Sequence, residues 1–298
     1  MTKRIDTVIF SLNRAMQLEV LLKSIEKHDI GKSLNVSILY SFSTHGYQKA
    51  YAKLKNKYPQ FNWLEETIYK PPKLNVDFDL FYWHNLYWWL KYKYLRKNKS
   101  NFKQKLIEIL TENDGEFAMF LTDDSLFYRN IEIPDLQPNS VFGLRHGTHL
   151  VGGKYNTTET GIEWNIYEND KTTDWGYPFS VDGHIYSKEA LLKITGKIIF
   201  NNPNAMEGNI ACYLQEKQLF SQIKANQHSC LLGFELNRVQ SVAENHHLGI
   251  SQEKLNYYFL DGYHLQIQFN RAQIQYFRPE IEEINVWKKE EKIKIYSR

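Results

Sequence analysis

Short β-rich runs alternate with amphipathic segments at the start of the chain, and this alternation constrains the fold more than any other sequence feature. The hydrophobic periods predict strands at 5–11, 34–40 and 61–66, and helices at 15–28 and about 47–58. Strands that alternate with helices form a mainly parallel sheet covered on both faces. The sequence therefore predicts an α/β fold, with Asn13 in place to cap the first helix.

A fourth apolar run, 116–124, ends in the adjacent carboxylates Asp123 and Asp124. Ligands bind at the carboxyl ends of parallel strands. Two neighbouring carboxylates repel each other unless a cation or a hydrogen-bond donor offsets them, and Mg²⁺ or Mn²⁺ takes one or two carboxylates together with phosphate oxygens. The alternative is a turn in which Asp accepts backbone hydrogen bonds. From the strand end alone, the metal site and the turn both stay open.

The pattern of the remaining residues predicts further strands and helices that complete the same α/β domain. A further strand is expected within 139–147, and helices at 187–194 and 205–218. No linker, repeat or low-complexity tract interrupts these segments, so a single domain over 1–298 is expected.

Composition narrows the class of protein. Apolar residues make up 42% and charged residues 24%, as in a globular protein, and the net charge of +3 does not imply nucleic-acid binding. Cys212 and Cys230 are too few for a disulfide scaffold or a thiolate zinc site and suit a reducing compartment. Aromatic residues reach 15%, which suits either core packing or stacking on sugars and bases.

The segment 80–110 is rich in aromatic residues in its first half and in Lys and Arg in its second. One interpretation is a core helix with a solvated basic end. The other is a peripheral contact of 81–105 with an anionic membrane or acceptor. No apolar run is long enough to span a membrane, and the amino terminus lacks the pattern of a signal peptide. A cytoplasmic location is expected, at the inner face of the membrane if 81–105 contacts lipid.

Several nucleotide and hydrolase signatures are absent from the sequence. It contains no GxxxxGK[ST] phosphate loop, and no GxGxxG dinucleotide motif follows the first strand. Neither a GxSxG nucleophile elbow nor an HExxH zinc motif is present. P-loop, dinucleotide-binding and hydrolase chemistry of these kinds are therefore excluded.

The opening strand, the sequence Ser-Leu-Asn-Arg at 11–14, the following helix with Leu18, Leu22 and Ile25, and the acids after Thr122 together resemble GT-A glycosyltransferases, especially family-2-like ones. The resemblance covers about residues 5–215. It implies a mixed, mainly parallel sheet flanked by helices, with a nucleotide-sugar-binding half (about 1–130) and an acceptor-binding half (about 131–298). The implied activity is metal-dependent transfer of a sugar, most simply from a UDP-sugar, to a glycan or lipid-linked glycan in cell-surface polysaccharide synthesis.

The resemblance also assigns roles to single residues. Asp124 would bind Mn²⁺ or Mg²⁺, Asp123 would lie near the ribose or the metal, and His246 or its neighbour would add a metal ligand; paired histidines in a polar loop are more often plain surface residues. Nucleotide contacts are expected from the ends of the first two strands, at Ser11, Asn13, Arg14 and Ser41. Family members often carry an acid where Ser41 stands, so the base of the nucleotide stays open.

An inverting transferase needs a general base for the acceptor hydroxyl. Glu207 opens a late helix at the place of the family's acidic motif, although one acid followed by glycine stands where the family has two. Asp182 is the rival, with Trp175 and Tyr177 nearby as sugar platforms. The structural alternatives are a helix-start acid for Glu207 and an Asp-Gly turn for Asp182.

Two other functions are compatible with these patterns. A nucleotidyltransferase also places carboxylates at strand ends, but usually with a Gly-rich loop that 11–17 lacks. A non-catalytic carbohydrate-binding protein would use the aromatic residues alone. We favour the glycosyltransferase.

Overall fold

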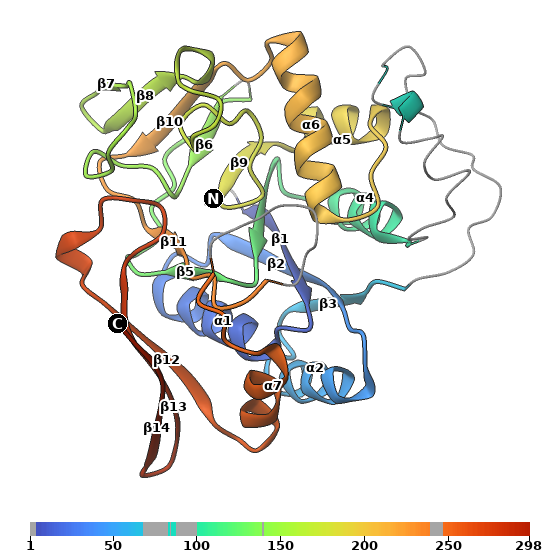
Figure 1. Ribbon diagram of the computed structural model, residues 1–298. Helices are drawn as coiled ribbons and strands as arrows, with labels where there is room; N and C mark the ends of the chain where they lie inside the picture. The colour runs from blue at the N-terminus through green and yellow to red at the C-terminus, as the bar shows by residue number, and fades with distance from the viewer. Residues whose placement is uncertain (1–3, 68–82, 84, 88–99, 139, 239–246) are drawn as a thin grey trace.

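The computed structural model describes the chain except for residues 1–3, 68–82, 84, 88–99, 139 and 239–246. Its main element is a nine-stranded sheet in the order β3-β2-β1-β4-β9-β6-β10-β8-β7 (Figure 1). The strands are β1 (Ile5–Leu12), β2 (Leu34–Ser41), β3 (Asn62–Glu65), β4 (Phe117–Thr122), β6 (Val141–Gly143), β7 (Asn156–Thr157), β8 (Gly161–Asn165), β9 (His184–Ser187) and β10 (Gln222–Asn226).

The order and direction of the strands confirm the predicted mixed, mainly parallel sheet. Strand β1 pairs in parallel with both β2 and β4, and β2 pairs in parallel with β3. Strands β8 and β9 run against the others. The carboxyl ends of β1, β2 and β4 therefore meet at one edge of the sheet.

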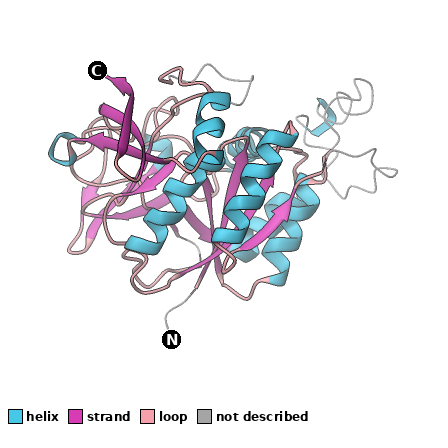
Figure 2. Cartoon of the chain, turned by 90° about the horizontal axis from the view of Figure 1, so that it is seen from below, coloured by secondary structure: helices cyan, strands magenta, loops and turns pink. Residues whose placement is uncertain are grey.

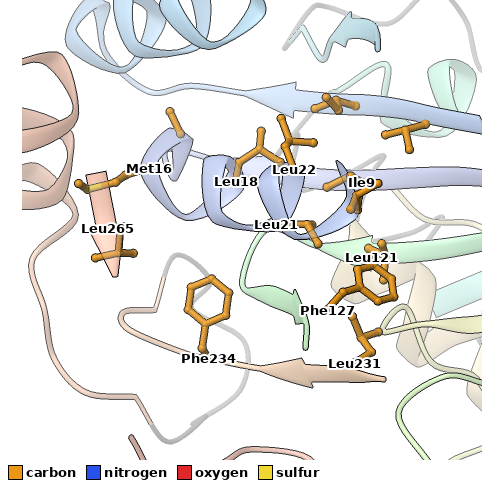
Figure 3. Packing of buried hydrophobic residues seen from close by; sticks show 14 of the residues in the cluster. Ile9, Met16, Leu18, Leu21, Leu22, Leu121, Phe127, Leu231, Phe234 and Leu265 are labelled. Atoms are coloured by element: carbon orange, nitrogen blue, oxygen red, sulfur yellow. The ribbon is translucent and has the colours of Figure 1, made fainter. Parts of the chain in front are cut away.

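Helices cover both faces of the sheet (Figures 1 and 2). Side chains along a strand point to the two faces in turn, so the strand residues belong to two separate buried clusters. Ile9 and Leu121 face the cluster that contains Leu21 and Leu22 of α1, as Figure 3 shows. The opposite cluster contains Phe120 and residues from the helices of the other face. The helices are α1 (Ala15–His28), α2 (His45–Lys57), α4 (Phe102–Glu112), α5 (Lys188–Lys197) and α6 (Pro203–Lys217).

Strand β9 places the loop that precedes it against the end of β4. Gly183 donates a hydrogen bond to the carbonyl of Phe120 (2.9 Å) and accepts one from Leu144 (3.0 Å). Its φ of 84° lies in the left-handed region, and a Cβ there would stand 2.3 Å from Leu231 Cδ2. The Asp182–Gly183 turn predicted from sequence thus has a steric reason for its glycine.

The carboxyl-terminal part adds elements that the sequence pattern did not predict. Helix α7 (Gln252–Leu260) is followed by an antiparallel sheet of β12 (His264–Phe269), β13 (Ile281–Lys288) and β14 (Glu291–Ser297) at one end of the molecule (Figure 2). Leu265 and Val286 of this sheet belong to the same buried cluster as α1. Two short strands, β5 (Ser125–Phe127) and β11 (Leu231–Gly233), pair separately, and 3₁₀ turns occur at Ile166–Glu168 and Arg271–Gln273.

The predicted cap of the first helix is wrong. Helix α1 begins at Ala15, so that Arg14 occupies the cap position without a side-chain cap hydrogen bond. The Asn13 side chain instead donates to Ser43 Oγ (3.0 Å) and accepts from the Ser43 N–H (2.8 Å). Asn13, whose φ is 59°, therefore links the loop after β1 to the loop after β2.

Most of the basic, aromatic segment at 81–105 lies outside the described residues, so its membrane contact stays a prediction. In the described part, Lys103 turns toward the protein: its Nζ donates to the carbonyl of Ile198 (2.7 Å) and lies 5.2 Å from the centre of the Phe200 ring. Of the helices described, none has the length and apolarity needed to cross a membrane.

The buried ion pair between Asp6 of β1 and Lys188 of α5 generates a stability prediction. Their side chains meet at 2.9 Å, and Asp6 is fully buried. We expect Asp6→Ala to lower the free energy of unfolding by about 3–5 kcal/mol, because the ammonium group of Lys188 would lose its counter-charge and keep the Asn113 carbonyl as an uncharged partner. Urea denaturation measures this loss. Glu189→Ala removes an exposed ion pair from the same helix as a control and should change stability little; equal losses in the two variants would contradict the prediction.

Candidate active site

Two carboxylates at the end of β4 share one buried guanidinium group. Arg14 Nη1 lies 3.0 Å from Asp123 Oδ1 and 2.8 Å from Asp124 Oδ2. Asp123 is 3% exposed and Arg14 8%, so the pairing with Asp123 takes place out of water. The cation removes the repulsion that two adjacent acids would otherwise suffer. The structure therefore brings together the two predicted acids and the predicted Arg14.

The second oxygen of Asp123 is also occupied. Ser11 Oγ donates to Asp123 Oδ2 at 2.8 Å, and the backbone N–H of Leu12 approaches the same oxygen at 3.3 Å. Tyr51 of α2 lies 2.6 Å from Ser11 Oγ and accepts from the Arg14 N–H (3.2 Å). Burial raises the pKa of Asp123 to about 6, while Arg14 and these donors favour its ionised form. Both carboxylate oxygens of Asp123 are thus held in place by hydrogen-bond donors.

Asp124 is more accessible than its neighbour. Only its Oδ2 is used by Arg14, and no described residue donates a hydrogen bond to its Oδ1. Its backbone carbonyl accepts from the Phe234 N–H at 2.8 Å. An ionised oxygen at the edge of a sheet, with its partner oxygen fixed, is a suitable ligand for a divalent cation.

Sequence reasoning missed Asn237, which lies after β11. Arg14 Nε donates to Asn237 Oδ1 at 2.9 Å, and Nη2 of Arg14 donates to the Asn237 carbonyl. These contacts fix the guanidinium group from the side opposite the acids. No local motif marks Asn237, since it meets Arg14 only through the tertiary fold.

The predicted nucleotide contacts come together at the same edge. Ser41 ends β2, and its carbonyl accepts a hydrogen bond from the Asn13 N–H at 3.3 Å. Asn13 and Ser43 are bonded to each other beside it. Ser11 and Ser41 lie in the last residues of the adjacent parallel strands β1 and β2, and Asn13 and Arg14 follow β1.

The two acids proposed for base catalysis line one cleft. Tyr177, Asp182 and Glu207 all contribute to its wall, together with Arg145 and Phe277. Asp182 is connected to the acid pair through Thr122, whose Oγ1 donates to Asp182 Oδ1 at 2.7 Å. Arg145 Nη1 lies 2.7 Å from the other carboxylate oxygen. Both oxygens of Asp182 are thus engaged, and the cleft adjoins the end of β4.

Glu207 has a different environment. Its Oε1 accepts a hydrogen bond from the Val181 N–H at 3.1 Å. Helix α6 begins at Pro203 and has no acid in its first turn, so the expectation that Glu207 opens the helix is wrong. Burial raises the pKa of Glu207 to about 8, and the negative charge of Asp182 adds to the effect. A carboxyl group with such a pKa can take a proton near neutral pH. The structure therefore places a carboxyl group with a raised pKa in the cleft.

Two other predicted residues are not in the site as described. Trp175 is 1% exposed, its Nε1 donates to the carbonyl of Val151 (3.0 Å), and its ring stacks on Tyr155, so it has no exposed face for a sugar. His246 lies outside the described residues. The neighbouring His247 is exposed and accepts a hydrogen bond from the Gly249 N–H. The described part of the chain contains no group of three or more His, Cys, Asp and Glu arranged to hold a metal ion.

Comparison with known proteins shows what the chain is similar to. No family model matches the chain. It is similar to the bifunctional glycosyltransferase pgtA of Dictyostelium discoideum, with 22% identity over an alignment of 286 residues. The match covers 81% of this chain. The chain resembles glycosyltransferases. It spans only 33% of the length of that relative.

Solved structures show weaker likenesses. TarS of S. aureus matches 76% of this chain and 36% of its own, with 14% identity and a TM-score of 0.43. The mannosyltransferase PcManGT from Pyrobaculum calidifontis, in complex with GDP-Man and Mn²⁺, matches 77% of this chain and 55% of its own, with 14% identity and a TM-score of 0.42. TM-scores below 0.5 do not establish a shared fold.

The raised pKa of Glu207 generates a prediction about stability and pH. A carboxyl group whose folded pKa exceeds its unfolded value stabilises the fold at low pH and loses this contribution as the pH rises through the folded pKa. We expect Glu207→Gln to unfold a few degrees higher than the wild type at pH 8, with the difference growing between pH 5 and 8. Thermal unfolding across this range measures it. Glu216→Gln, on the exposed end of the same helix, is the control; a difference for Glu207→Gln that does not change with pH would contradict the prediction.

Proposed function

We propose that this chain is a glycosyltransferase that moves a sugar from a nucleotide-sugar donor to an acceptor hydroxyl group. The observation that carries the proposal is the position of the cleft with Glu207, which adjoins the Asp123–Asp124 pair through Thr122 and Asp182. Donor and acceptor must meet for transfer, and this arrangement would bring the two substrates together. Similarity to pgtA supports the same reaction class.

The donor would bind at the carboxyl ends of β1, β2 and β4. Ser11, Asn13 and Ser41 stand where the nucleoside would lie, and Arg14 holds Asp123 in place. The unused Oδ1 of Asp124 fits a Mn²⁺ or Mg²⁺ ion, which would neutralise the charge of the departing diphosphate. The donor that we propose is a UDP-sugar.

The acceptor would bind in the cleft, with Tyr177 on its wall. Its hydroxyl proton would pass to the Glu207 carboxylate while the oxygen forms a bond to the anomeric carbon. The bond from that carbon to the diphosphate breaks, and the nucleoside diphosphate leaves with the electron pair. Asp182 is less suited to be the base, because Thr122 and Arg145 occupy both of its oxygens. The acceptor proposed is a glycan or lipid-linked glycan used in cell-surface polysaccharide synthesis.

The donor site can be tested without an acceptor. We expect UDP or GDP to raise the melting temperature more with Mn²⁺ or Mg²⁺ than with EDTA, since a ligand that binds only the folded state stabilises it. Asp124→Asn should remove the metal-dependent part of the shift. Asp114→Asn, at an exposed position before β4, is the control. An unchanged metal-dependent shift in Asp124→Asn would show that this carboxylate is not the ligand.

The base can be tested by comparing its two candidates. We expect Glu207→Gln to bind donor normally and to transfer about 10²–10⁴-fold more slowly, because a general base acts in the transfer step. Asp182→Asn should mainly raise the KM for the acceptor. The measurement is kcat at saturating acceptor, together with its pH dependence: in the wild type, the rate should rise with pH as Glu207 loses its proton near pH 8. If only Asp182→Asn lost the transfer rate, Asp182 would be the general base and Glu207 would contribute to acceptor binding.

A further inference from the structure

Arg14 has every nitrogen of its guanidinium group engaged. Its Nη1 lies 3.0 Å from Asp123 Oδ1 and 2.8 Å from Asp124 Oδ2. Its Nε donates to Asn237 Oδ1 at 2.9 Å, and its Nη2 donates to the Asn237 carbonyl. Because Arg14 is only 8% exposed, moving its side chain would break these bonds and leave buried charges unpaired. Arg14 is therefore a fixed cation at the end of β4.

The charges at this edge of the sheet nearly balance without a bound ion. Ionised Asp123 and Asp124 carry two negative charges against the one positive charge of Arg14, which leaves one negative charge. Glu235, which follows the residue bonded to the Asp124 carbonyl, is itself paired with Arg278. A single net negative charge attracts a divalent cation only weakly.

Few oxygens of the acid pair are left for a cation. Both oxygens of Asp123 accept hydrogen bonds, from Arg14 and Ser11, and Asp124 Oδ2 accepts one from Arg14. Asp124 Oδ1 accepts none from a described residue, and the described part of the chain has no group of three or more acids, histidines and cysteines suited to a metal. A Mg²⁺ ion in such a place takes its other ligands from water and substrate phosphates. Both the missing ligands and the missing negative charge are properties of a nucleoside diphosphate.

We propose that Arg14 makes cation binding at Asp124 conditional on the diphosphate of the nucleotide. The guanidinium group repels a Mn²⁺ or Mg²⁺ ion that approaches Asp124 Oδ1, and it attracts the diphosphate. The ion and the nucleotide then each raise the affinity for the other by the same factor. Arg14 is thus a positioning residue that also controls when the ion binds. The assignment rests on the proposed function, because it takes Asp124 as the metal ligand.

Binding of Mn²⁺ to the full wild-type chain is the first test. The EPR signal of the free ion measures binding at pH 7 with and without UDP. We expect UDP to tighten Mn²⁺ binding at least about 10-fold, after correction for the Mn²⁺–UDP complex that forms in solution. Mn²⁺ that binds equally tightly without UDP would overturn the proposal.

The variant Arg14→Gln tests the residue itself. Mn²⁺ alone should bind about 10-fold more tightly than to the wild type, because the repelling charge is gone, whereas UDP without metal should bind more weakly. These opposite shifts distinguish a lost charge from a damaged site, in which both affinities would fall. Arg271→Gln removes the same charge from an exposed 3₁₀ turn and should change neither affinity.

The variant Asp123→Asn keeps the proposal testable if Arg14→Gln does not fold. It removes one negative charge while the guanidinium group stays, so Mn²⁺ alone should bind about 10-fold more weakly than to the wild type. Thermal unfolding shows which variants fold. The proposal is wrong if the affinity for Mn²⁺ alone does not rise in folded Arg14→Gln, or does not fall in Asp123→Asn.

Failure of the proposed function gives a different result. Absence of sugar transfer, with the coupling between Mn²⁺ and UDP and its dependence on Arg14 intact, would reject the transferase and keep the role of Arg14. Transfer without this coupling would reject only the role of Arg14. Absence of Mn²⁺ binding even with UDP would reject the metal site at Asp124 together with the role of Arg14.

Discussion

The ion pairs of Arg14 with Asp123 and Asp124 are the contacts on which the rest of the site depends. Two adjacent carboxylates at a buried strand end would otherwise protonate or disrupt the edge of the sheet. Because Arg14 ends the β1 loop and Asn237 follows β11, one side chain joins three segments that are distant in sequence. This pairing leaves one oxygen of Asp124 available at the edge where a donor would bind.

A second arginine organises the neighbouring cleft in the same manner. Arg145 pairs with Asp182 beside Thr122, and the charge of Asp182 adds to the effect of burial on the pKa of Glu207. A carboxyl group whose pKa is raised in this way can exchange a proton near neutral pH, which supports the proposed role of Glu207.

Much of the parallel half was predictable from local pattern. The strands at 5–11 and 34–40 and the helix at 15–28 follow from hydrophobic period, and the acids at the end of the fourth strand follow from the rule for parallel sheets. Side-chain partners were less predictable. Asn13 looked like a helix cap but bonds to Ser43 across two loops, and Trp175 looked like a sugar platform but is enclosed by the core.

Sequence alone determined the alternation of strands and helices, the strand end at Asp123 and Asp124, and the candidate bases Asp182 and Glu207, because these signals lie within a few residues of each other. Tertiary structure alone decided that Arg14 pairs with both acids, that Asn237 contacts Arg14, and that Arg145 contacts Asp182. Such contacts join residues that are tens to hundreds of positions apart. Their strength depends on burial and on distances of about 3 Å, which only the folded chain sets.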